Sequence, residues 1–279
     1  IWNTFMYPSW KRKVYLAEGW SVTMVSKLQH DELEQLKNFR LTEKAFPSEL
    51  SITVKELLNK AELHPLLRKL QDILNSPDLK VTTSMFVKRY GFFAVLSLYS
   101  MTILNKGLNV KLENISLENN EDKELSVWLP NFRFEDLEVT EPGSDRNGWR
   151  DTYLKMLFSE HIHELVLVLA KEIKISKLVL WENIAIYIFW LYDMLLEDER
   201  FSSIKDRIEE DYLYVVEKAP GHLFGTYNKN PLSRYYTLKT YFPEHDKEIR
   251  VRKTCCFYYQ TTANQGDHCL TCPIICKRK

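Results

Sequence analysis

The chain has long apolar segments on both sides of a central segment in which apolar and polar residues alternate. The segments 85–107, 149–172 and 176–198 are rich in Leu, Ile, Val and Phe, and each is long enough for several helical turns. In 149–172 the apolar residues recur at the three- and four-residue spacing of an α-helix. We therefore predict three long helices, whose most apolar parts, 91–104 and 184–195, are buried in the core.

The central residues 110–139 follow the two-residue period of a strand, and we expect two or three antiparallel strands there. Nearer the N-terminus, Asp31 and Glu34 have the spacing of a helix-capping box, and a further helix is expected from Ser51. These segments predict an α+β fold that is predominantly helical, with a small antiparallel sheet or hairpin in the middle of the chain.

Turn-forming residues suggest how the fold is divided. The sequence EPGSDRNG at 141–148 is the clearest linker by composition. We expect an N-terminal helical and β subdomain over residues 1–145, a helical subdomain over 146–250 and a C-terminal segment over 251–279 that contains all the cysteines.

Composition narrows the classes of function. The 279 residues are 45% hydrophobic, and 38 basic side chains balance 38 acidic ones. A net charge of zero gives no field that would attract nucleic acid. The first twenty residues lack the apolar core of a signal peptide, and both apolar runs are shorter than the roughly 20 residues that span a bilayer. We expect a cytoplasmic protein without a transmembrane segment, for which peripheral membrane association stays open.

The cysteines are the most specific feature of the sequence. All of them lie near the C-terminus, as an adjacent pair, a C-x2-C pair and one more: Cys255, Cys256, Cys269, Cys272 and Cys276. A disulfide framework is disfavoured, because five is an odd number and small secreted scaffolds spread their cysteines along the chain. A structural zinc site would use four thiolates, or three with His268, but adjacent cysteines converge poorly on one small ion. A [2Fe–2S] cluster takes two thiolates on each iron, which suits two pairs separated by a loop.

The sequence RKTCCFYY followed by C-x2-C resembles the C-terminal motif of the FhuF-like ferric-siderophore reductases, in which Cys-Cys-x10-Cys-x2-Cys binds a [2Fe–2S] cluster. Upstream, KRYGFFAVLSLYSM, NKGLNV and WENIAIYIFWLY resemble the domain that this family shares with the C-terminal part of aerobactin-type siderophore synthetases. The resemblance covers roughly residues 80–279. Twelve residues separate the two pairs here instead of ten, and Cys276 is additional.

This resemblance implies an oxidoreductase that passes one electron from a [2Fe–2S] cluster to the Fe(III) of a hydroxamate or citrate-type siderophore and releases Fe(II) inside the cell. Cys255, Cys256, Cys269 and Cys272 would be the cluster ligands. The additional Cys276 is interpreted as a free thiol near the C-terminus, with a substitute ligand or a redox thiol as alternatives. The implied partners are the ferric siderophore and an electron donor such as a ferredoxin or flavoprotein.

Two alternatives stay open. One is a zinc-stabilised siderophore-binding or interaction module without redox activity. The other is a synthetase-like enzyme, although the chain has no Gly-rich phosphate loop such as GxxxxGK, which argues against ATP chemistry.

Several polar residues are candidate contacts to an anionic ferric complex, and they are Arg250, Arg252, Lys253, Tyr258, Tyr259 and Lys106. Each also suits an ordinary structural role: a solvated strand for the basic residues, core packing for the tyrosines and a polar helix end for Lys106. His161 and His163 suggest a metal pair, but residues two apart on a helix point to different faces, so we interpret them as structural. The tripeptide Trp181–Asn183 is suited to hydrogen-bond a loop in the core.

Overall fold

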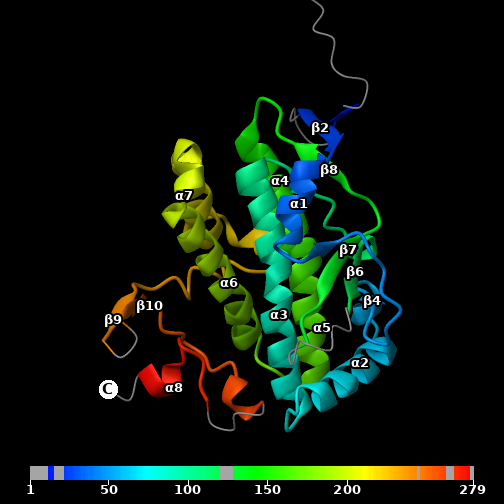
Figure 1. Cartoon of the computed structure of the whole chain (residues 1–279), viewed down its shortest axis with the longest axis vertical. Coiled ribbons are helices and arrows are strands. Elements are labelled where there is room, and N and C mark those ends of the chain that lie inside the picture. Colours follow the sequence, from blue (N-terminus) through cyan, green and yellow to red (C-terminus); the bar gives the residue numbers. More distant parts are fainter. Residues whose placement is uncertain (1–11, 16–21, 120–127, 244–245, 262–266, 277–279) are drawn as a thin grey trace, which may run out of the picture.

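The computed structural model describes residues 12–15, 22–119, 128–243, 246–261 and 267–276, and Figure 1 shows the whole chain. Helices dominate the described residues: α1 (His30–Lys37), α2 (Lys60–Ile73), α3 (Leu79–Tyr99), α4 (Arg146–Leu157), α5 (His163–Ile173), α6 (Lys177–Glu197), α7 (Lys205–Leu213) and α8 (Pro273–Cys276). The strands are short: β1 (Arg12–Tyr15), β2 (Val22–Lys27), β3 (Leu41–Thr42), β4 (Ile52–Thr53), β5 (Gly107–Leu108), β6 (Ile115–Glu118), β7 (Asn131–Phe134), β8 (Glu138–Glu141), β9 (Thr240–Phe242) and β10 (Lys247–Ile249). The predicted α+β, mainly helical fold is confirmed.

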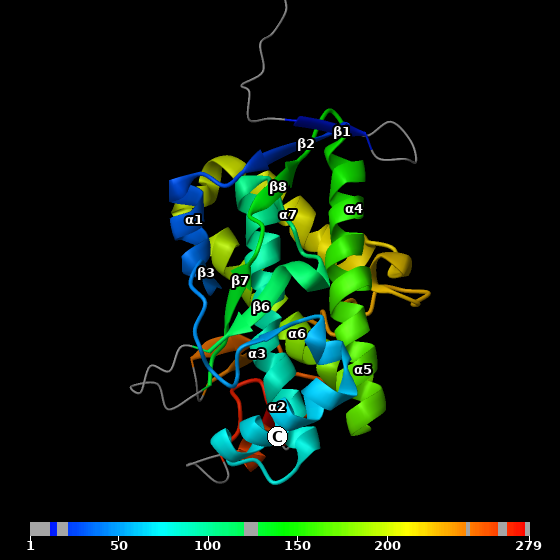
Figure 2. The same ribbon diagram turned by 90° about the vertical axis from the view of Figure 1, so that its right-hand side faces the viewer.

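The strands form two small sheets and a hairpin. One sheet has the order β1-β2-β8-β5 and is antiparallel throughout, and it lies at one end of the helical body (Figures 1 and 2). The other has the order β3-β7-β6-β4, with only β3 and β7 parallel. The predicted central strands are present as β6, β7 and β8, although β8 joins the first sheet; Leu125 and Val127 lie outside the described residues. The hairpin β9–β10 falls in a segment for which no strand was expected.

The helices α3 and α6 form the centre of the molecule (Figure 1). Most of their side chains are buried, and α3 begins at Asp78, whose carboxylate accepts the backbone N–H groups of Lys80 and Val81 at 2.8 and 2.9 Å. The two helices approach closely at Gly91, where a Cβ atom would lie 2.9 Å from the ring of Tyr187. Among the described helices, α6 alone is long and apolar enough to cross a membrane, but 67% of its most apolar window is buried in the protein. That burial is typical of a core helix.

Two predicted helix starts are wrong. The helix α1 begins at His30, where the Glu32 carboxylate accepts the Gln29 backbone N–H at 2.7 Å, so Asp31 and Glu34 are not its capping pair. The residues after Ser51 form β4, which pairs with β6, and α2 starts only at Lys60. The partner strand decides the conformation here, because β-branched residues favour a half-buried sheet position over a helix.

A π-helical turn, Phe158–Ile162, joins α4 directly to α5, so the predicted helix over 149–172 is one rod (Figure 2). His161 in this turn donates from Nδ1 to the Val110 carbonyl at 2.6 Å and accepts the Tyr90 hydroxyl at Nε2. Burial lowers the pKa of His161 to about 4, which keeps the imidazole neutral. His163 instead packs against the Tyr227 ring at 5.2 Å, so the two histidines serve different contacts.

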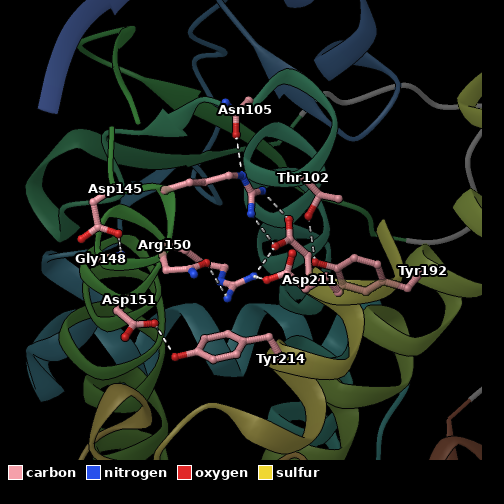
Figure 3. Close-up of polar contacts among 12 residues, drawn as sticks. Thr102, Asn105, Asp145, Gly148, Arg150, Asp151, Tyr192, Asp211 and Tyr214 are labelled. Atoms are coloured by element: carbon pink, nitrogen blue, oxygen red, sulfur yellow. Dashed lines mark hydrogen bonds and ion pairs between the residues drawn. The ribbon is translucent and has the colours of Figure 1, made fainter. Parts of the chain in front are cut away.

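Buried ion pairs fix α7 to α4 (Figure 3). The fully buried Asp211 carboxylate on α7 accepts from Arg146 at 2.6 and 2.9 Å and from Arg150 at 2.8 Å. Arg146 also donates to Asn105 at 2.9 Å, at the end of the turn that follows α3. These bonds hold three helices together at the end of α3 that leads into β5.

The predicted division into three segments stays a prediction. The connection within 141–148 is short, since β8 ends at Glu141 and α4 begins at Arg146. Buried side chains from all three segments, among them Leu36, Leu165 and Cys256, belong to one hydrophobic core.

Candidate metal centre

The described residues around the cysteines, 251–261 and 267–276, are called the cysteine segment. This segment lies against the first turns of α3 and α6, and Figure 1 shows it in orange and red at the lower end of the molecule. On α3, the Ser84 hydroxyl donates to the Cys256 carbonyl at 2.8 Å. The Arg252 backbone N–H donates to the Thr271 carbonyl at 3.0 Å, which ties the residues between β10 and the first cysteine pair to the loop inside the second pair. The main chain therefore brings the two pairs together.

One thiol from each pair is in contact. The Sγ atoms of Cys256 and Cys269 are 3.6 Å apart, and Cys256 is buried. The Cys272 backbone N–H donates to the Cys269 carbonyl at 2.9 Å, so the C-x2-C pair forms a tight turn before α8. Cys255 is partly exposed and accepts the Phe257 backbone N–H on its sulfur at 3.3 Å.

The contact pair lies in a positive environment. Hydrogen bonding to the Cys269 thiol lowers the pKa of Cys256, and the Lys88 and Arg252 cations add to this effect against the cost of burial. The same hydrogen bond raises the pKa of Cys269. This environment favours the thiolate at Cys256, which is the form of cysteine that binds metals.

Two buried polar side chains of α6 hold the residues just before the cysteines. The Glu182 carboxylate accepts the backbone N–H groups of Lys253 and Thr254 at 2.6 and 2.7 Å. The neighbouring Asn183 accepts from Arg252 Nη2 at 2.6 Å. The loop that Trp181–Asn183 was expected to hold is thus the start of the cysteine segment for Glu182 and Asn183, whereas the Trp181 indole donates to the Tyr227 hydroxyl at 2.8 Å.

The basic candidates for substrate contact lie in three different environments. The Arg250 guanidinium is stacked over Phe189 and Tyr236, with 5.0 and 4.5 Å to the ring centroids. Arg252 is only 2% exposed, so its side chain does not reach the surface, whereas Lys253 is exposed.

The two tyrosines lie beside the cysteines. Lys88 Nζ is 4.9 Å from the centroid of the Tyr258 ring, and Tyr259 stacks on His268 at 4.9 Å. Both side chains are partly exposed.

Lys106 is not brought to this site. It is buried at the opposite end of α3, where its Nζ forms an ion pair with Glu32 at 2.6 Å. The helix from Ser84 to Tyr99 alone spans about 22 Å at 1.5 Å per residue. That length of helix separates Lys106 from Ser84, which contacts the first cysteine pair.

A groove of about 390 Å³ runs beside the cysteine segment. Its walls are α6, residues 247–252, and Leu270 with Thr271, which stand between Cys269 and Cys272. Trp190 on α6 lines it and is 44% exposed. The sequence showed no sign of this groove, because its walls come from segments far apart in the chain.

The donor chemistry of the segment fits an iron–sulfur cluster. Among the described residues, no three His, Cys, Asp or Glu side chains are gathered closely enough to hold a metal ion. A four-thiolate set requires Cys255 and Cys272 to turn toward the pair formed by Cys256 and Cys269. Soft thiolates with Lys88 and Arg252 nearby suit an anionic group such as a cluster with four cysteine ligands.

Comparison with known proteins supplies the family. A family model described as "Ferric iron reductase FhuF-like transporter" matches residues 84–239. Comparison with curated proteins finds no match. The matched region runs from Ser84 in α3 to the residue before β9, and it includes the Glu182 and Asn183 contacts on α6 but not the cysteines. By this match, which covers more than half of its length, the chain belongs to the FhuF-like ferric iron reductase family.

Proposed function

We propose that this protein reduces ferric siderophores by one electron, with a [2Fe–2S] cluster held by Cys255, Cys256, Cys269 and Cys272. The observation that carries the proposal is the 3.6 Å contact between Cys256 and Cys269, one thiol from each pair, in a ferric iron reductase family member. When bound, such a cluster supplies one-electron transfer.

The chemistry of iron explains why reduction would release it. The Fe(III) of a siderophore gains one electron from a ferredoxin or flavoprotein donor and becomes Fe(II), and no bond within the siderophore breaks. Fe(II) is softer and carries less charge, so the same hard oxygen donors hold it less tightly. We place this reaction in the cytoplasm, where Fe(II) would be taken up by other proteins.

The groove beside α6 is the docking site in this proposal. Leu270 and Thr271 form one wall, so a bound complex would lie one residue away from Cys269 and Cys272. Trp190 offers an apolar face. The charged lining residues are four cations, Lys239, Lys247, Arg250 and Arg252, against the three carboxylates Asp193, Glu197 and Glu248, so the balance for an anionic chelate is slightly positive. A volume of about 390 Å³ is within the ordinary range for small-molecule sites.

The substitution Trp190→Ala tests the docking site. We expect the second-order rate constant for reoxidation of the reduced protein by a ferric hydroxamate to fall about tenfold, the loss that about 1.4 kcal/mol of binding energy produces. Stopped-flow absorbance measures this rate. Ile73→Ala removes a similarly exposed apolar side chain, on α2, and is the matched control. Equal rates for wild type and Trp190→Ala would exclude this groove.

The visible spectrum of protein purified without oxygen tests the cofactor. We expect a brown protein with about two irons per chain and bands between roughly 400 and 600 nm. Dithionite should bleach the bands, and a ferric hydroxamate should restore them. A colourless protein with one zinc would refute electron transfer and favour the zinc-stabilised binding module.

A further inference from the structure

We propose that Arg252 is a positioning residue that donates a hydrogen bond from Nη1 to the thiolate–sulfide cluster and thereby raises its reduction potential. The inference deepens the proposed function and rests on it. It assigns to Arg252 a buried role toward the cofactor in place of a contact with the siderophore.

Arg252 has an unusual environment for a permanent cation. Its side chain is fully buried, and a buried guanidinium requires partners for its charge and for its N–H groups. Nη2 donates to Asn183 at 2.6 Å, and Nε donates to the Thr254 carbonyl at 3.2 Å. Nη1 has no hydrogen-bond partner among the described residues. A buried donor without an acceptor costs free energy, so an acceptor is expected at Nη1.

The acceptor is not the nearby carboxylate. Glu182 lies 3.8 Å from Arg252 Nε, which is too long for a hydrogen bond. Its oxygens already accept the Lys253 and Thr254 backbone N–H groups and the Thr254 hydroxyl. Glu182 therefore offsets part of the charge of Arg252 and leaves Nη1 free for another anion.

The contacts of Arg252 place it between the two cysteine pairs. Its backbone N–H donates to the carbonyl of Thr271, which stands between Cys269 and Cys272. Its guanidinium is held by Asn183, whose amide also donates to the Ser84 carbonyl at 2.8 Å and the Ser84 hydroxyl at 2.9 Å. That hydroxyl in turn donates to the Cys256 carbonyl. The network thus links Arg252 to the main chain of both cysteine pairs, and its cation acts electrostatically on the Cys256 thiol.

A fixed N–H donor and a positive charge favour the more negative redox state. Reduction adds one electron to the cluster, so the hydrogen bond and the cation stabilise the reduced form more than the oxidised form. In low-dielectric surroundings this difference is large. Removing the guanidinium should make reduction less favourable.

The test is a redox titration of loaded protein, followed at the visible bands, with iron counted in each variant. For Arg252→Gln we expect iron content as in wild type and a roughly tenfold less favourable reduction, which is a midpoint about 59 mV lower for one electron. Arg252→Lys keeps the charge but loses the planar fork that directs separate nitrogens at Asn183 and at the cluster, so we expect a smaller fall of about threefold. Lys106→Gln is the control, since that buried cation pairs with Glu32 at the opposite end of α3, and should change the equilibrium less than twofold.

The outcomes separate this inference from the proposed function. Wild-type protein without iron would refute the proposed function before any variant is made. If both Arg252 variants have the midpoint potential of wild type and only a lower melting temperature, the role of Arg252 is structural and the inference is overturned. If Arg252→Gln takes up no iron, Arg252→Lys decides alone, and a potential equal to that of wild type overturns the inference.

Discussion

Alanine at any one of Cys255, Cys256, Cys269 and Cys272 should remove the visible bands and the reduction of ferric siderophores, whereas Cys276→Ala should keep both. A cluster with four cysteine ligands loses an iron–sulfur bond in each of the first four variants, and alanine offers no replacement donor. Iron per chain, absorbance and the reoxidation rate measure the result. We expect the rate of the four variants to fall to that of protein without iron.

Cys276 is the matched control because it has the same chemistry in the same segment. It is the last residue of α8, and its thiol donates only a long contact, 3.7 Å, to the Leu270 carbonyl. Circular dichroism of each variant distinguishes a lost ligand from a lost fold. One result would contradict this assignment. If one of the four alanine variants keeps iron at the wild-type level and Cys276→Ala loses it, Cys276 belongs to the ligand set.

The sequence was sufficient for the helical core and the cysteine segment. The apolar runs 91–104 and 184–195 lie in α3 with its following turn and in α6, and most of their side chains are buried as expected, although Trp190 is 44% exposed. The cysteines stand together in the chain, so their proximity needed no knowledge of the fold. Their role as cluster ligands stays a prediction.

The sequence indicated that Trp181–Asn183 would hydrogen-bond a loop in the core, because adjacent polar residues in an apolar helix need partners. It did not indicate which loop. Glu182 and Asn183 sit about 70 residues before Arg252, and only the packing of α6 against residues 252–254 gives them partners. Lys106 failed as a candidate for the converse reason: the length of α3 places it at the far end of the molecule.

Strand assignments depended on partners in the same way. Ile52 and Thr53 pair with Leu117 and Ser116, which follow more than sixty residues later, and this pairing displaced the helix expected from Ser51. The middle strands could be predicted because apolar and polar residues alternate along them. The strands that they pair with could not be predicted. Local period predicts a strand; the sheet it joins depends on distant segments.

The largest change in stability is expected for Asp211→Ala, a loss of about 3–5 kcal/mol in the free energy of unfolding. Asp211 is fully buried and accepts from Arg146 and Arg150, and the Arg150 side chain is only 3% exposed (Figure 3). Alanine would leave the Arg150 cation buried without this carboxylate, and the surviving partner of that cation is Glu210 at the surface. Urea unfolding followed by circular dichroism measures the loss.

Glu210→Ala provides the comparison, because Glu210 also pairs with Arg150, at 3.0 Å, but its side chain is 58% exposed. Solvent screens this pair, so we expect a loss below about 1 kcal/mol. Both variants remove a carboxylate from Arg150. They differ in burial and in the Arg146 pair, which Asp211 alone accepts. Similar losses would mean that the burial of Asp211 does not increase its contribution to the free energy of unfolding. Apolar packing would then be the main source of stability at this end of the molecule. Because the network lies at the end of α3 remote from Ser84, neither variant that folds should change the reduction potential, whereas Arg252→Gln should.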